Sequence, residues 1–112
     1  MSLTKEALLE GAKDDPPHLL GEFFGHKVFV KPMSELKRSR RLAGMFDDDG
    51  KLKPAYLERA RVYAITDHVC DEEGNNLYSD KDVPDLLNLS CEKIEPLHEA
   101  IKDWIEGNEG NE

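Results

Sequence analysis

The sequence predicts an α+β fold: a single, mainly helical domain over residues 1–112 with one N-terminal β-hairpin. Apolar residues recur over most of the predicted helical region, residues 34–106, at the spacing of helices that bury one face. They alternate at strand spacing only within residues 18–31. Clusters of proline, glycine and aspartate separate these segments. The chain length suits one domain with a modest core.

The stretch from Lys53 to Ser79 is predicted to be the centre of the fold. Pro54 suits the first position of a helix, because its missing N–H would have no partner there. The apolar residues that follow cover more than half of the helix surface, which predicts packing from several sides: Leu57, Ala60, Val62, Tyr63, Ala64, Ile65 and Val69. Polar residues, Thr66 and Asp67 among them, are expected to face water. An acidic turn over residues 71–76 then returns the chain to the core.

Residues 1–13 are predicted to form a short helix that Ser2 or Thr4 caps and Gly11 ends. A helix of this length is marginal by itself, so it must dock or fray. A break at residues 14–17 follows, because the residue before a proline avoids the helical region.

The β-hairpin is predicted over residues 18–31, with strands at His18–Phe23 and Lys27–Lys31. Gly25 marks the turn, and Phe23 and Phe24 are expected near the bend. An isolated hairpin is not stable in water, so helices are expected to cover one of its faces.

The next helix is predicted to begin at Glu35, capped by Ser34, and to end near residues 44–46. It carries Leu36, Leu42, Ala43 and Met45 together with the basic cluster of the chain: Lys37, Arg38, Arg40 and Arg41. Such a cluster is usually a helix face in water. The alternative is a surface for a partner or for self-assembly.

A short helix is predicted over residues 80–87, capped by Ser79 or Asp80, with Pro84 tolerable only in its first turn. Ser90 is expected to cap the last helix, whose apolar stripe consists of Ile94, Leu97, Ile101, Trp104 and Ile105. We expect Trp104 to be buried in one cluster with Ile65 of the central helix.

The last helix has two features that affect its bounds. Pro96 lies too deep for a continuous helix from Cys91, so we expect either a separate first turn or a kink. Gly107 is predicted to end the helix, and residues 107–112 are predicted to form a disordered tail.

The net charge of −9 argues against nucleic-acid binding, which needs a basic surface. Residues 1–65 carry 12 Lys and Arg against 10 Asp and Glu, whereas residues 66–112 carry 3 against 14. The simplest interpretation is an acidic surface in water. The alternative is a molecule with two unlike ends that associates head to tail.

The sequence has neither a basic leader followed by an apolar run nor an apolar run long enough to span a membrane. We therefore expect a cytosolic protein whose cysteines, Cys70 and Cys91, are unlinked thiols.

Metal and catalytic sites are weakly indicated. Placing Gly50 or Gly74 at the sixth position of a calcium loop puts an apolar residue at the first position, so calcium binding is not expected. A zinc or thiol enzyme would have to use His68, Cys70, Cys91 and His98, whose spacing matches no common site. Phosphate loops and nucleophile elbows do not occur in the sequence. The sequence therefore favours a protein without catalysis or a cofactor.

The order of motifs resembles the tail assembly chaperones of lambda-like, long-tailed bacteriophages. Residues 4–9 are similar to the family's opening TKEALL helix, residues 22–32 stand at its strand pair, and residues 33–36 at its LSAAER-like helix start. The most specific match is DEEGNNLYSDKDV, residues 71–83, against the family's DEDGNRLFSDEDV. The resemblance covers nearly the whole chain and departs from the family at Pro84 and Pro96.

The resemblance implies a chaperone without catalytic activity. It implies that the chain binds the tape-measure protein in the host cytoplasm, keeps it soluble, recruits tail-tube subunits and is absent from the mature virion. It also implies self-association into rings or spirals, and the residues expected to serve partners or self-assembly are Phe23, Phe24, Lys37, Arg38, Arg40 and Arg41. The alternative is a small regulatory module whose basic helix docks on an acidic target.

Overall fold

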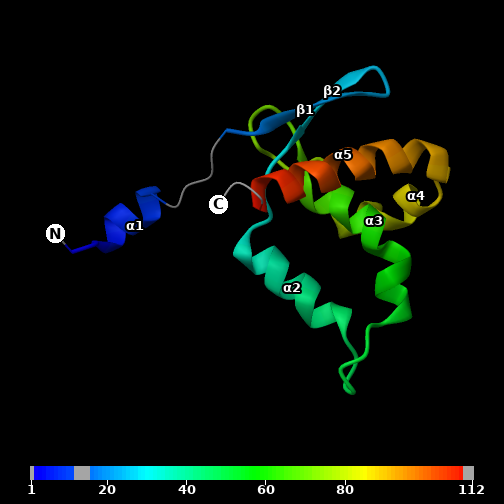
Figure 1. Ribbon diagram of the computed structural model, residues 1–112, viewed down its shortest axis with the longest axis horizontal. Coiled ribbons are helices and arrows are strands. Elements are labelled where there is room, and N and C mark those ends of the chain that lie inside the picture. The colour runs from blue at the N-terminus through cyan, green and yellow to red at the C-terminus, as the bar shows by residue number, and fades with distance from the viewer. Residues whose placement is uncertain (1, 12–15, 110–112) are drawn as a thin grey trace.

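The computed structural model describes residues 2–11 and 16–109 and has the predicted α+β class. Within these residues it contains five α-helices, one short 3₁₀ helix and a three-stranded antiparallel sheet (Figure 1). Helix α3 (Pro54–His68) lies at the centre, packed against α5 (Cys91–Glu109), α4 (Val83–Leu87) and the 3₁₀ helix η1 (Asp80–Asp82). The stretch that the sequence places at the centre of the fold does lie there.

Helix α1 (Lys5–Gly11) lies apart from the other elements at one end of the molecule (Figure 1). Its cap is Thr4, whose hydroxyl accepts a hydrogen bond of 3.0 Å from the backbone N–H of Ala7. The leucines of this short helix, Leu8 and Leu9, are exposed. The last two residues of the predicted segment 1–13 lie outside the described residues.

The hairpin consists of β1 (His18–Phe23) and β2 (His26–Val30), so the first strand has its predicted bounds and the second begins and ends one residue earlier than predicted. A third strand, β3 (Val69–Cys70), pairs with β2 in antiparallel register. It is not predicted by the sequence pattern, because a strand of two residues has no measurable alternation. The inner face of the hairpin packs on the core through Leu20, Phe23 and Val28.

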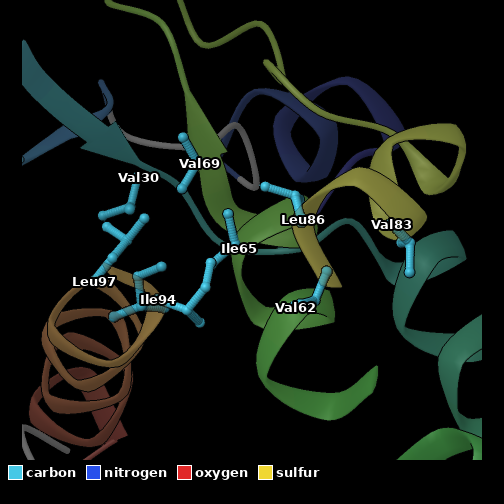
Figure 2. Close-up of a cluster of buried hydrophobic side chains, with 9 residues drawn as sticks. Val30, Val62, Ile65, Val69, Val83, Leu86, Ile94 and Leu97 are labelled. Carbon is cyan, nitrogen blue, oxygen red and sulfur yellow. The ribbon is translucent and has the colours of Figure 1, made fainter. Parts of the chain in front are cut away.

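The core forms where β2, β3, α3, α4 and α5 converge (Figure 2). Its buried side chains are Val30, Val62, Ile65, Val69, Val83, Leu86, Ile94, Leu97 and Ile101. Ile65 is buried as expected, whereas Trp104 is half-buried and packs against the edge of the same cluster. The indole ring covers His18 on one side and meets the ring of His68 edge-on.

The end of α3 corrects one prediction. Thr66 and Asp67, expected to face water, are 0% and 4% exposed. They lie in the last turn of α3, where β3, α2 (Glu35–Met45) and the loop after β3 surround the helix. Here Asn76 donates a side-chain hydrogen bond of 3.3 Å to the carbonyl oxygen of Thr66. Polar residues on this turn are therefore buried with partners, as burial requires.

Ser79 is the cap that begins the α4 region. Its hydroxyl accepts a hydrogen bond from the N–H of Lys81, and its own N–H donates one of 2.8 Å to the Asp82 carboxylate. Pro84 lies in the first turn of α4, where its missing N–H costs no helix hydrogen bond.

Helix α5 has no separate first turn before Pro96, and it does not end at Gly107. It begins at Cys91 and continues past Pro96, and it passes Gly107 to end at Glu109. Ile94, Leu97 and Ile101 are buried on both sides of the proline, so tertiary packing outweighs the hydrogen bond that Pro96 cannot donate. The predicted tail therefore overlaps the helix at residues 107–109, and residues 110–112 lie outside the described residues.

Candidate binding surface

Helix α2 has the predicted bounds, and its N-cap is Ser34, which accepts a hydrogen bond of 3.2 Å from the N–H of Lys37. Its half-buried residues are Lys37, Arg41 and Met45, which follow each other one turn apart and therefore share one face. All residues of this helix are described, and none is fully buried. The face that α2 turns toward α3 is thus mainly cationic.

Arg41 holds α2 against the rest of the molecule. Its Nε and Nη2 atoms donate to the two carboxylate oxygens of Asp67, at 2.8 and 2.7 Å. Nη2 also donates to Asp80 of η1 at 2.6 Å, and the guanidinium carbon lies 3.9 Å above the centre of the Tyr63 ring. We call Arg41, Asp67, Asp80 and Tyr63 the Arg41 clasp.

The charges of the clasp depend on one another. The hydrogen bonds to Asp67 raise the pKa of Arg41 above its ordinary value, despite an opposing effect of burial. The hydrogen bond from Arg41 lowers the pKa of the Asp80 carboxyl. Asp67 is 4% exposed; Arg41 pairs with it in a bidentate geometry, and the Lys37 ammonium lies 3.7 Å away.

Because the face with Lys37 and Arg41 is turned inward, the leucines of α2 are turned outward. Leu36 is 61% exposed, Leu42 48% and Phe46, just after the helix, 46%. Ala43 is exposed between them, and Leu52 faces Phe46 in an antiparallel bridge. We call these five residues the α2 stripe. A helix normally buries such a stripe, so this surface is a candidate binding site.

Arginines border the α2 stripe on both sides. Arg38 and Arg40 are exposed, and within the described residues neither side chain makes a hydrogen bond or an ion pair. Beside Arg40 lies an open hollow of about 280 Å³, which is lined by Ser34, Leu36, Lys37, Arg40, Arg41, Ser79 and Asp80. Three cations thus face one carboxylate, Asp80, which Arg41 already pairs.

The hairpin tip is a second exposed apolar point. Phe24 is 59% exposed and has a φ of +56°, which is unusual for a bulky residue. With Gly25, at a φ of +79°, it forms the two-residue turn that joins β1 to β2. Phe23 instead packs against the core.

The structure therefore divides the residues predicted for partner binding or self-assembly. Phe24, Arg38 and Arg40 are exposed, whereas Phe23, Lys37 and Arg41 serve the fold of their own chain. The sequence analysis identified the basic cluster but missed the α2 stripe as a surface. A signal was available in the positions of Lys37 and Arg41, which lie one turn apart on a face that carries none of the leucines.

The four residues weighed for zinc or thiol chemistry have separate environments. His68 is buried and donates from Nδ1 to the carbonyl oxygen of Lys31 at 3.0 Å, and burial lowers its pKa. Cys70 is a buried free thiol whose pKa is raised by burial, and Cys91 is an exposed free thiol. His98 is half-buried on α5. Among residues 2–11 and 16–109, no group of three or more His, Cys, Asp and Glu side chains could hold a metal ion.

Comparison of the chain with protein-family models, curated proteins and solved structures found no match. In the part of the chain that the structure describes, no helix has both the length and the apolar character needed to cross a membrane. Fold and surface together define a small, mainly helical α+β protein with an apolar, arginine-bordered helix on its outside.

Proposed function

We propose that this protein is a phage tail assembly chaperone, which binds the tape-measure protein in the host cytoplasm, keeps it soluble and recruits tail-tube subunits. The observation that supports this proposal most directly is the exposure of the α2 stripe, because a chaperone for an apolar partner needs apolar surface of its own. The run DEEGNNLYSDKDV supports it independently as a sequence resemblance.

Co-expression with a tape-measure protein tests the proposal. We expect the tape-measure protein to stay in the supernatant with this chain and to precipitate without it, and we expect tail-tube subunits to join the complex on purification. An unrelated acidic protein of similar size is the control. A tape-measure protein that is equally insoluble with and without the chain would contradict the proposal.

Self-association is a separate part of this proposal. The charge-reversal test must spare Arg41, because changing it would release α2 from Asp67 and Asp80. We expect oligomers that shrink at high salt and in the Arg38→Glu, Arg40→Glu double variant, since exposed ion pairs are screened by salt. Light scattering across protein and salt concentrations measures this. A chain that stays monomeric at high concentration would contradict it.

The second candidate function is a regulatory module whose basic helix docks on an acidic target. It is favoured by the exposure of Arg38 and Arg40. Purification of complexes from phage-infected cells separates the two functions, because it identifies the bound partner.

A further inference from the structure

Most residues of the α2 stripe lie on one side of a single helix, a side that also carries Glu35 and Ser39. Leu36 and Ala43 are two helical turns apart, Leu42 and Phe46 are one turn apart, and Leu52 bridges to Phe46. Leu77 and Leu89 are exposed in turns, Leu8 and Leu9 lie on the shorter helix α1, and Leu57 is a single exposed leucine of α3. At about 1.5 Å per residue, α2 is about 16 Å long, so its stripe is long enough to contact two to three turns of another helix.

The charges around the α2 stripe indicate which charges a helix bound there should carry. Arg38 borders the stripe on one side and Arg40 on the other. The hollow beside Leu36 and Arg40 is lined by three cations and by Asp80. Arg41 is already paired with Asp67 and Asp80, and the Lys37 ammonium lies 3.7 Å from Asp67. A carboxylate reaching into this hollow would meet Arg40, together with the hydroxyl-bearing side chains of Ser34 and Ser79.

We propose that the α2 stripe is the docking surface for an amphipathic helix of the client protein whose apolar side chains are flanked by carboxylates. This inference rests on the proposed function, since it names the surface and the chemistry of the client segment. Burial of leucines and Phe46 supplies affinity, and the arginines select an acidic helix over a basic one.

Two other occupants fit this surface less well. A second copy of α2 would place its own four cations, with a single Glu35 among them, beside those of the first copy. An anionic membrane would attract Arg38 and Arg40 but repel a chain whose net charge is −9. Both remain outcomes of the test below.

The probe is a fluorescein-labelled synthetic helix of about 20 residues, long enough to be helical in water, with a leucine stripe flanked by glutamates. A matched peptide carries lysines in place of the glutamates. We expect the full chain to bind the acidic peptide about tenfold or more tightly than the basic one, as measured by fluorescence anisotropy. Binding of neither peptide, or a preference for the basic peptide, would overturn the proposal.

Variants of the chain test whether the acidic peptide binds at the α2 stripe. Leu36→Ser with Leu42→Ser should weaken binding of the acidic peptide by about tenfold or more. Leu77→Ser with Leu89→Ser, a change of two leucines with comparable exposure elsewhere, should leave it unchanged. Equal effects of the two pairs would overturn the proposal. Arg38→Glu with Arg40→Glu should reverse the preference toward the basic peptide, while circular dichroism and urea unfolding should show that this variant is folded like the wild type.

Two further measurements separate the competing explanations. Binding to phosphatidylglycerol vesicles without binding to the acidic peptide would mean that the occupant of the α2 stripe is a membrane. A dimer that light scattering detects and that depends on the stripe would mean that the occupant is a second copy of the chain. If the tape-measure protein stays equally soluble with the wild type and the Leu36→Ser, Leu42→Ser variant, the docking surface is wrong and the proposed function stands. If the wild type does not solubilise it while the peptide results hold, the function is wrong and the surface stands.

Discussion

Helices α2 and α5 are both amphipathic, but they use their apolar sides in opposite ways. In α5, Ile94, Leu97 and Ile101 are buried against α3 and its neighbours, and charged residues face water. In α2, the charged residues Lys37 and Arg41 face the rest of the molecule, and the leucines face water. The difference teaches that an apolar stripe does not by itself decide which side of a helix is buried. In α2, pairing with Asp67, a buried carboxylate on the neighbouring helix α3, outweighs the tendency of the leucines to be buried.

The largest effect is expected in the α5 stripe. Ile101→Ala should lower the free energy of unfolding by about 2–5 kcal/mol, because Ile101 is fully buried and its truncation leaves a cavity. Urea unfolding followed by circular dichroism measures this. A loss below about 0.5 kcal/mol, the usual effect of a surface change, would mean that α5 does not pack as described.

The Arg41 clasp should contribute less than the core but more than any surface residue. Asp67→Asn should cost about 1.5–3 kcal/mol, because it removes the charge-assisted partner of Arg41 while Asp80 keeps its own hydrogen bond. The same urea titration measures the cost, and faster hydrogen exchange confined to α2 would identify the helix that is released. Glu95→Gln, at the exposed pair with Arg61, is the control and should cost little.

The surroundings of His68 and the Arg41 clasp should also respond to different ranges of pH. Burial lowers the pKa of His68 in the folded protein, so its contribution to stability is complete above about pH 6.5 and is lost as pH falls below that, where the unfolded chain takes up the proton first. The slope should not exceed about 1.4 kcal/mol per pH unit for this one group. His68→Gln should flatten this dependence of stability on pH, which urea unfolding at a series of pH values measures.

The Arg41 clasp should also lose stability as the pH falls, but in a lower pH range than His68. The pKa of Asp80 is lowered in the folded protein by its hydrogen bond from Arg41, so its contribution is present above about pH 3.9 and is lost as pH falls through the folded value. Exchange of α2 amides should therefore rise only in strongly acidic solution. A release of α2 already near pH 6 would contradict the assignment of Asp80 to the clasp.

The hairpin tip offers a change in the stabilising direction. Phe24→Asn should raise the free energy of unfolding by about 1 kcal/mol, because asparagine adopts a positive φ more readily than phenylalanine and Asn-Gly suits this type of turn. Thermal unfolding measures the gain. Phe29→Asn, on the neighbouring strand, is the contrasting variant and should destabilise, since Phe29 is half-buried and pairs with Leu19 and Cys70 on the two strands beside it.

The smallest effect is expected for the α2 stripe itself. Leu42→Ala should change the free energy of unfolding by less than about 0.5 kcal/mol, because the side chain is about half exposed and alanine favours a helix. Comparison with Ile101→Ala under the same conditions gives the contrast between the two helices directly. A loss of 2 kcal/mol or more would mean that Leu42 is buried in solution, and α2 would then resemble α5.

Much of the fold follows from local rules that the sequence contains. The period of the apolar residues and the caps Ser34 and Ser79 determine where helices begin, and Pro54 and Pro84 lie in first turns, where proline is favoured. Gly25 determines where the hairpin turns. These are interactions between neighbours in the chain, so the sequence alone specifies them.

The tertiary structure decided what depends on residues far apart. Helix α5 continues through Pro96 and Gly107 because packing on α3 stabilises it, and β3 exists because Val69 and Cys70 lie beside β2. The orientation of α2 depends on Asp67, which lies 26 residues after Arg41. Periodicity identifies the two faces of a helix but not their neighbours. A buried ion pair, strong only once both partners leave water together, decided which face became the surface.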